Sequence, residues 1–254
     1  MRETKYYFGR TSTDDYLAYN LGHIFLHGRT QFYLDAYVDS FLLRFIEETT
    51  PNEVTLRIHD CCATEAIWQD KYLEGYGWKG ISIIDSVKFS VKGDNIMGTL
   101  YDMHDLYEKR IKSPNLSKEK NMILLLRDYN LSYSEDARDE IMFLLKNGAS
   151  AKIYLILTSS GEDVEIEKEV LAEFDYILST TNSEENSQYL FGTDDASEDV
   201  LPAFGIIIVK YGIDILRFNS LFSPYTFIKK VIRSLSVSKD AYHTNEEIKD
   251  VSND

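Results

Sequence analysis

Hydrophobic positions recur with two different periods along this chain, and the two periods alternate. Short apolar or β-branched runs predict strands, at 23–28, 53–60, 121–128, 152–160 and 174–179. Apolar residues spaced three or four positions apart predict amphipathic helices, at 31–48, 96–111 and 134–147. Strands that alternate with helices are typical of an α/β fold, in which helices cover both faces of a mostly parallel sheet.

The rest of the chain carries weaker or different signals. Residues 204–220 predict a β-hairpin that turns at 210–212, and Ser223 with Pro224 begins a last amphipathic helix. Fainter patterns predict a strand within 3–13, helices at 63–74 and 163–173, and a strand at 80–85. From Ser236 the composition is polar and acidic, so we expect one domain over 1–235 and a disordered tail over 236–254.

Charge, hydropathy and cysteine content indicate which partners and which cellular compartment suit the chain. The 254 residues include 42 acids and 27 bases, for a net charge of −15, and we see no dense run of lysine and arginine. Because affinity for nucleic acid comes mostly from cations that neutralise phosphates, this balance argues against a nucleic-acid partner. No apolar stretch approaches 18 residues, so we expect no membrane span. The adjacent Cys61 and Cys62 predict reduced, inert thiols in a cytosolic protein.

One short stretch occupies the place of a phosphate-binding loop. Residues 27–36, "HGRTQFYLDA", join a predicted strand to a predicted helix. A phosphate loop has the pattern G-x-x-x-x-G-K-[ST]. Counting from Gly28 through Arg29 and Thr30 places Tyr33 on the second glycine, Leu34 on the lysine and Asp35 on the hydroxyl residue.

Each of these replacements works against a bound phosphate. The Tyr33 ring takes space that the backbone needs, Leu34 removes a cation, and Asp35 adds a negative charge. Two interpretations stay open. One is an ordinary turn that starts a helix and binds nothing. The other is a nucleotide loop that has lost its charges, in which the helix N-terminus and Arg29 still attract an anion.

Four later segments follow one another in an order that resembles a known family. They are "NMILLLRDYN" (121–130), "EIMFLLKNGASAKIYLILTSS" (140–160), "TNSEENSQYLFG" (181–192) and "LPAFGIIIVKYG" (201–212). Together with the loop, they resemble the FtsK/SpoIIIE-type ATPases, a branch of the RecA-like P-loop fold. The resemblance covers roughly residues 20 to 220. It implies a RecA-like fold with a mostly parallel central sheet, helices on both faces and a C-terminal β-hairpin.

The same resemblance identifies the positions where the ATPase chemistry would lie. Asp128 matches the first acid of the second motif, and Tyr129 replaces the glutamate that would activate water. Ser160 stands where the family has a glutamine that senses the γ-phosphate. Gln188 replaces the arginine offered to a neighbouring subunit. These losses imply a degenerate ATPase without catalytic residues or a required cofactor, while weak binding of ATP and magnesium stays open.

Within the family, the chain is most similar to a C-terminal module of the EssC-type motors of type VII secretion. That resemblance implies a non-catalytic domain that recognises secreted substrate proteins or regulates neighbouring ATPase modules. It also implies the cytosolic part of a larger, membrane-anchored protein that can assemble as a hexamer. The alternative is a working DNA-translocating or conjugation coupling ATPase with divergent Walker motifs, which would require salt-sensitive DNA binding.

Two further features have simple and functional interpretations. Residues 161–199 hold 13 acids and one base, Lys168, and form either a solvated surface or a docking site for a basic or amphipathic partner. Among the five histidines only His23 and His27 are close in sequence, and nothing near them has metal-ligand spacing. We therefore expect no metal site.

Overall fold

The computed structural model describes residues 4–49, 52–60, 87–90, 96–129, 134–197 and 206–220. An eight-stranded sheet lies at the centre, with the strand order β10-β9-β8-β3-β7-β6-β4-β5. Six neighbouring strands run parallel: β3 (Ile24–Gly28), β4 (Val54–Asp60), β5 (Val87–Ser90), β6 (Asn121–Arg127), β7 (Ile153–Ser160) and β8 (Tyr176–Ser179). The predicted α/β fold with a mostly parallel sheet is confirmed.

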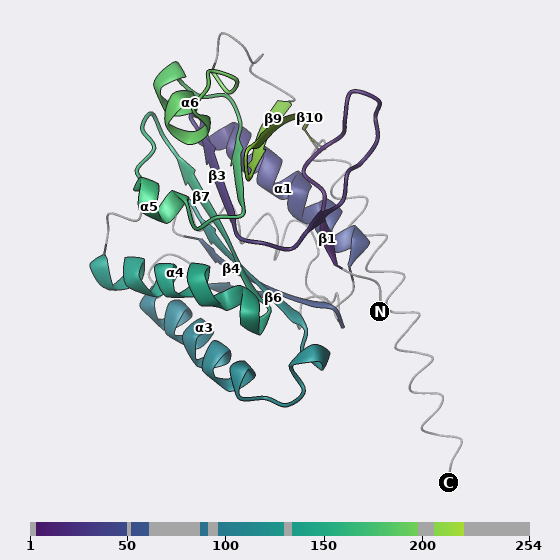
Figure 1. The fold of residues 1–254 in the computed structure, drawn as a ribbon, viewed down its shortest axis with the longest axis vertical. Helices are drawn as coiled ribbons and strands as arrows, with labels where there is room; N and C mark the ends of the chain where they lie inside the picture. Colours follow the sequence, from purple (N-terminus) through teal and green to yellow (C-terminus); the bar gives the residue numbers. More distant parts are fainter. Residues whose placement is uncertain are drawn as a thin grey trace.

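Helices cover both faces of the sheet. The 18-residue α1 (Gln31–Glu48) lies on one face, while α3 (Ile96–Ile111) and α4 (Glu135–Asn147) lie side by side on the other (Figure 1). Alternate residues of the buried strands point to opposite faces, so Leu125 packs in the α1 core and Leu124 in the α3–α4 core. Among the described residues, no helix is long and apolar enough to span a bilayer.

The helix α1 owes its position to a continuous apolar stripe. Its buried members share the helical spacing that the sequence predicts, and they are Leu34, Tyr37, Val38, Phe41, Leu42 and Phe45. Each fully buried side chain of this size contributes about 2 kcal/mol through removal from water. This packing fixes the start of α1 next to the end of β3.

The helix α4 begins where the sequence indicates. The Ser134 side chain accepts a hydrogen bond from the Ala137 amide at 3.3 Å, and two acids in the first turn suit the positive end of the helix dipole. Gly148 does not end the helix in a left-handed conformation. It begins the 3₁₀ helix η5 (Gly148–Ala151), and Lys152 takes the left-handed conformation instead, with φ 56°.

The remaining elements differ more from the predictions. In the described part of the segment 3–13, the strand is short: β1 (Lys5–Tyr6), which pairs with β2 (Tyr19–Asn20). The helix expected at 163–173 is reduced to α5 (Lys168–Leu171). The helix α6 (Glu184–Phe191) was not predicted, although the Ser183 cap and the left-handed Gly192 mark its two ends. The elements expected at 63–74, 80–85 and after 222, the pair Cys61 and Cys62, and the tail lie outside the described residues.

The predicted antiparallel hairpin of β9 (Ile206–Tyr211) and β10 (Asp214–Asn219) is confirmed, but it turns at 212–213 rather than at 210–212. It joins the sheet through β8. The far end of β10 meets the N-terminal segment, because Arg10 and Asn219 exchange two backbone hydrogen bonds of 2.9 and 2.8 Å. Gly9 allows this approach, since a Cβ on it would lie 2.5 Å from the Asn219 carbonyl oxygen.

Candidate functional site

The sequence motifs meet at the carboxyl edge of the parallel strands. The strand β7 lies between β3 and β6, and the register pairs Gly28 with Ser160. Asp128 follows the last residue of β6, so the ends of all three strands converge. In open α/β sheets, ligands bind outside this edge. The structure therefore brings together three of the positions that the sequence predicts for the site.

The connection from β3 to α1 is very short. The strand ends at Gly28 and the helix starts at Gln31, so Arg29 and Thr30 alone form the turn. The amides of Tyr33 and Leu34 already donate to the Thr30 carbonyl, at 3.1 and 3.2 Å. The turn is also tightly packed, because a Cβ on Gly28 would lie 2.4 Å from the Thr180 hydroxyl.

The three positions counted from Gly28 therefore lie inside α1. Leu34 is 1% exposed, and its Cβ lies 3.3 Å from where a Gly28 Cβ would be. Tyr33 is partly buried, and its ring lies edge-on to that of Phe32 at 5.6 Å. Asp35 points toward β6 rather than toward the turn. Their side chains serve helix packing and pairing.

Asp35 forms a bidentate ion pair with Arg127, the last residue of β6. The Arg127 Nε lies 3.1 Å from one carboxylate oxygen, and an Nη contacts the other. The Arg127 side chain is 2% exposed and that of Asp35 is 20% exposed. A guanidinium removed from water this completely requires a carboxylate of matching geometry. The pair therefore ties the start of α1 to the end of β6.

Asp128 and Ser160 form the polar centre of the edge. One Asp128 carboxylate oxygen accepts from the Ser160 amide at 3.0 Å and from its hydroxyl at 2.7 Å. Asp128 has a left-handed backbone, with φ 52°, and its amide donates to the Thr158 hydroxyl at 2.8 Å. The Tyr129 amide donates to the Thr158 carbonyl, and its side chain is 4% exposed. The Asp128 oxygen thus holds β6 and β7 together.

The cation of the turn is paired with the acidic segment. Arg29 donates to the Glu162 carboxylate at 2.8 Å, and the Glu162 carbonyl accepts from the Asn186 side chain at 2.7 Å. The contact links the turn to the loop after β7 and to α6. Because both side chains are partly exposed, the pair contributes at most about 1 kcal/mol. Gln188 lies exposed on α6.

His27 is a buried titratable group beneath this edge that the sequence did not single out as functional. It is 0% exposed, and burial lowers its pKa to about 4, although the Ser159 backbone and the charge of Asp128 act in the opposite direction. Burial likewise lowers the pKa of His23 to about 4. Both imidazoles are neutral near pH 7, so neither offers a positive charge to an anion.

This burial predicts a pH-dependent stability. Between pH 6.5 and pH 4 the unfolded chain binds a proton at His27 that the folded chain does not, so stability falls as the pH falls through that window. On lowering the pH from 7.5 to 5, the free energy of unfolding should decrease by about 2 kcal/mol less in His27→Leu than in the parent chain. Urea titrations at both pH values measure this difference. Identical pH dependence in the two proteins would contradict the prediction.

Among the described residues, no group of three or more histidine, cysteine, aspartate or glutamate side chains is arranged to hold a metal ion. Asp128, at the junction of β6 and β7, already binds Ser160 through one oxygen. The arrangement holds three strand ends and one helix start in a fixed relation. Its chemistry, as far as the described residues go, is that of paired charges and of hydrogen bonds between neighbouring elements.

No sequence-family model and no curated protein sequence matches this chain. Solved structures do match its fold. The EssC ATPases 2 and 3 from Geobacillus thermodenitrificans superpose with a TM-score of 0.71 at 15% identity, over 95% of this chain and 50% of theirs. The ATPases 2 and 3 of Thermomonospora curvata EccC, solved in complex with a signal sequence peptide, give 0.63 at 13% identity, over 87% and 41%.

A third match comes from conjugation. The pCW3 coupling protein TcpA, in a monomer form with ATPγS, superposes with a TM-score of 0.66 at 14% identity, over 92% of this chain and 71% of that one. The chain therefore has the fold of the RecA-like P-loop ATPases of the FtsK/SpoIIIE type. Within that class, it resembles the EssC and EccC motor modules over nearly its whole length, and it spans about half the length of the EssC structure.

Proposed function

We propose that this chain is a non-catalytic ATPase-like domain of a type VII secretion motor. In this role it recognises secreted substrate proteins or regulates neighbouring ATPase modules, as part of the cytosolic portion of a larger protein. The fold supports the class of protein. The observation that carries the non-catalytic role is the two-residue turn after β3, which leads directly into a helix with Leu34 in its core.

Three contacts at the turn and at the start of α1 bear on nucleotide binding. The space beside Gly28 is filled by Thr180, and the carboxylate of Asp35 is held by Arg127. Glu162 supplies a negative charge to Arg29, where a phosphate would otherwise be attracted. Nucleotide phosphates would therefore have to displace a carboxylate on an acidic surface, and no lysine on the turn or in α1 attracts them. The same contacts favour a turn that binds no ligand.

The purified chain should hydrolyse no ATP above the buffer rate, and millimolar magnesium ATP should raise its melting temperature by less than about 1 °C. A coupled ATPase assay and a thermal shift titration measure the two quantities. Glu162→Gln is a more sensitive test of nucleotide binding, because it removes the carboxylate that pairs with Arg29. Only a small rise in the nucleotide response is expected in that variant. Robust turnover by the parent chain would overturn the proposal.

The second candidate is a working DNA-translocating or coupling ATPase, which the match to TcpA with ATPγS favours. A DNA-translocating enzyme requires affinity for DNA that weakens steeply with salt. Fluorescence anisotropy with a labelled duplex at low salt separates the two functions. A flat titration together with absent turnover rejects the DNA-pumping ATPase, and saturable, salt-sensitive binding supports it.

A further inference from the structure

The amino ends of the strands, opposite the turn, carry a basic segment on this acidic chain. Residues 109–120 hold five bases and one acid, while the whole chain has a net charge of −15. They form the C-terminal end of α3 and the 3₁₀ helix η3 (Leu116–Lys118), just before β6. This segment therefore differs in sign from the acidic segment 161–199.

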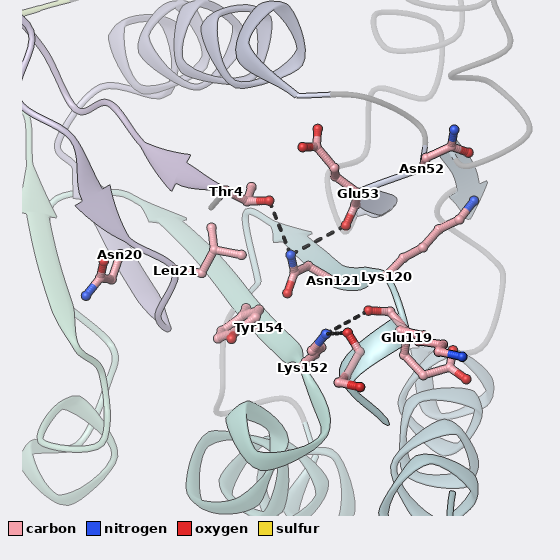
Figure 2. Close-up of a pocket in the computed structure, with 12 residues that line it drawn as sticks. Thr4, Asn20, Leu21, Asn52, Glu53, Glu119, Lys120, Asn121, Lys152 and Tyr154 are labelled. Carbon is pink, nitrogen blue, oxygen red and sulfur yellow. Dashed lines mark hydrogen bonds between the residues drawn. The ribbon is translucent and has the colours of Figure 1, made fainter. Parts of the chain in front are cut away.

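A cavity of about 440 Å³ opens beside this segment. It lies where β4, β6 and β7 begin, next to the β1–β2 pair (Figure 2). Three lysines line it, Lys118, Lys120 and Lys152. The amide side chains of Asn20, Asn52 and Asn121 also line it, and Leu21 and Tyr154 add apolar surface. The cavity is thus of the size of a ligand site and combines cations, amides and a small apolar area.

Lys152 is positioned by the fold itself. Its ammonium donates to the carbonyls of Ser117 and Glu119, at 2.9 and 3.0 Å (Figure 2). An ammonium has three donors, so within the described part of the chain one N–H remains for a ligand. The residue also adopts a left-handed conformation that usually suits glycine or asparagine and costs a lysine about 1 kcal/mol. A fixed cation at the cavity is the result.

Lys118 and Lys120 extend the positive charge to the rim. Both are exposed, and neither takes part in an ion pair within the part of the chain that the structure describes. Glu53 and Glu119 lie on the same rim, so the lining has three cations and two anions. The lining therefore keeps a net positive charge and presents its cations to carboxylates at defined places.

We propose that this cavity binds an acidic, extended segment of a partner protein. Carboxylates of the segment would meet Lys118, Lys120 and the free donor of Lys152, while its backbone meets the asparagine amides. A concave site of this size admits an extended peptide segment, whereas a nucleic-acid duplex or the flat surface of a membrane cannot enter it. The site lies away from the turn, so the proposal does not depend on whether the turn binds nucleotide.

Fluorescence anisotropy with a fluorescein-labelled peptide, Glu-Leu-Glu-Glu-Leu-Glu, tests the site on the full chain. We expect saturable binding that weakens as salt rises. The glutamine counterpart of the peptide should bind at least about tenfold more weakly, because it lacks the charges. The double variant Lys118→Glu with Lys120→Glu should lower the affinity by about tenfold. Lys152→Asn keeps a residue suited to the left-handed conformation and should lower it by about fivefold.

The matched control is the double variant Lys109→Glu with Lys112→Glu, which changes the net charge equally. Lys109 lies in the last turn of α3 and Lys112 just after the helix, and neither lines the cavity. The affinity of this control should stay within about twofold of the parent chain. If both double variants lose the same affinity for the peptide, the net charge of the chain explains the binding and the proposal is overturned. It is also overturned by absent binding at millimolar protein, or by binding of duplex DNA or phosphatidylserine vesicles that the cavity variants abolish while the peptide fails to bind.

Discussion

The variant Leu34→Lys, which restores the lysine of a phosphate loop, should lose stability and gain no nucleotide binding. The Leu34 side chain is 1% exposed among the apolar residues of α1 and β3. An ammonium placed there gives up its hydration without a carboxylate partner, at a cost of about 4 kcal/mol or more. Urea unfolding monitored by circular dichroism measures the loss, and a thermal shift titration with magnesium ATP measures the binding.

Leu34→Met is the matched control, because it keeps the volume and the apolar character of the side chain. Its cost should be less than about 1.5 kcal/mol. The prediction fails if Leu34→Lys unfolds at the urea concentration of the parent chain and its melting temperature rises with ATP. That result would show that residue 34 reaches the turn and that the helix start rearranges.

Asp35→Ala should destabilise the chain by about 3 kcal/mol, because it leaves the buried Arg127 guanidinium without the carboxylate that it contacts twice. The same change also removes a negative charge near the start of α1, which adds a smaller loss. The pair is shielded from solvent, so the effect should persist at high salt. Urea titrations at low and high sodium chloride give both values.

Asp14→Asn provides the comparison on the surface, because asparagine removes the charge and tolerates the left-handed backbone of this residue, with φ 65°. Asp14 pairs with Arg10 at 2.9 Å, but their side chains are 74% and 45% exposed. Its loss should cost less than about 1 kcal/mol and should shrink further in salt. If the two aspartate variants lose similar amounts of free energy, the Asp35–Arg127 pair is not the link between α1 and β6 that its burial indicates.

Most of the architecture was predictable, because the strongest hydrophobic patterns in the sequence each fit a single kind of secondary structure. The apolar runs at 121–128 and 152–160 are buried on both faces of the sheet, as expected of central strands in a parallel sheet. The apolar stripe of 31–48 matches α1 from its first to its last residue. For these elements, periodicity and tertiary packing favour the same structure.

At the turn, two sequence patterns disagreed. Motif spacing placed Tyr33, Leu34 and Asp35 around a phosphate, whereas helical periodicity placed Tyr33 and Leu34 on an apolar stripe. The structure follows the periodicity, since Leu34 gains about 2 kcal/mol from burial in the core. The assignment of Asp128, Tyr129, Ser160 and Gln188 to lost catalytic roles stays a prediction.

The contacts that were missed depend on partners distant in sequence. Arg127 within an apolar strand indicated a buried partner, but only the fold shows that this partner is Asp35. The helix at 163–173 was overestimated because acids four positions apart, such as Asp163 with Glu167 and Glu165 with Glu169, repel on a helix. The short α6 is rich in weak helix formers, and its cap Ser183 and terminal Gly192 were the signals available.

The bridge between Arg10 and Asn219 has a consequence for synthesis on the ribosome. Tyr6 and Phe8 share their apolar core with Phe218, so both residues need a partner that is synthesised about two hundred codons after them. Until the hairpin has left the ribosomal exit tunnel, Phe218 does not cover the rings of Tyr6 and Phe8. Contacts between residues so distant in sequence slow folding. A chain that ends before residue 206 should therefore expose this apolar surface and aggregate, and chaperones and proteases should remove it.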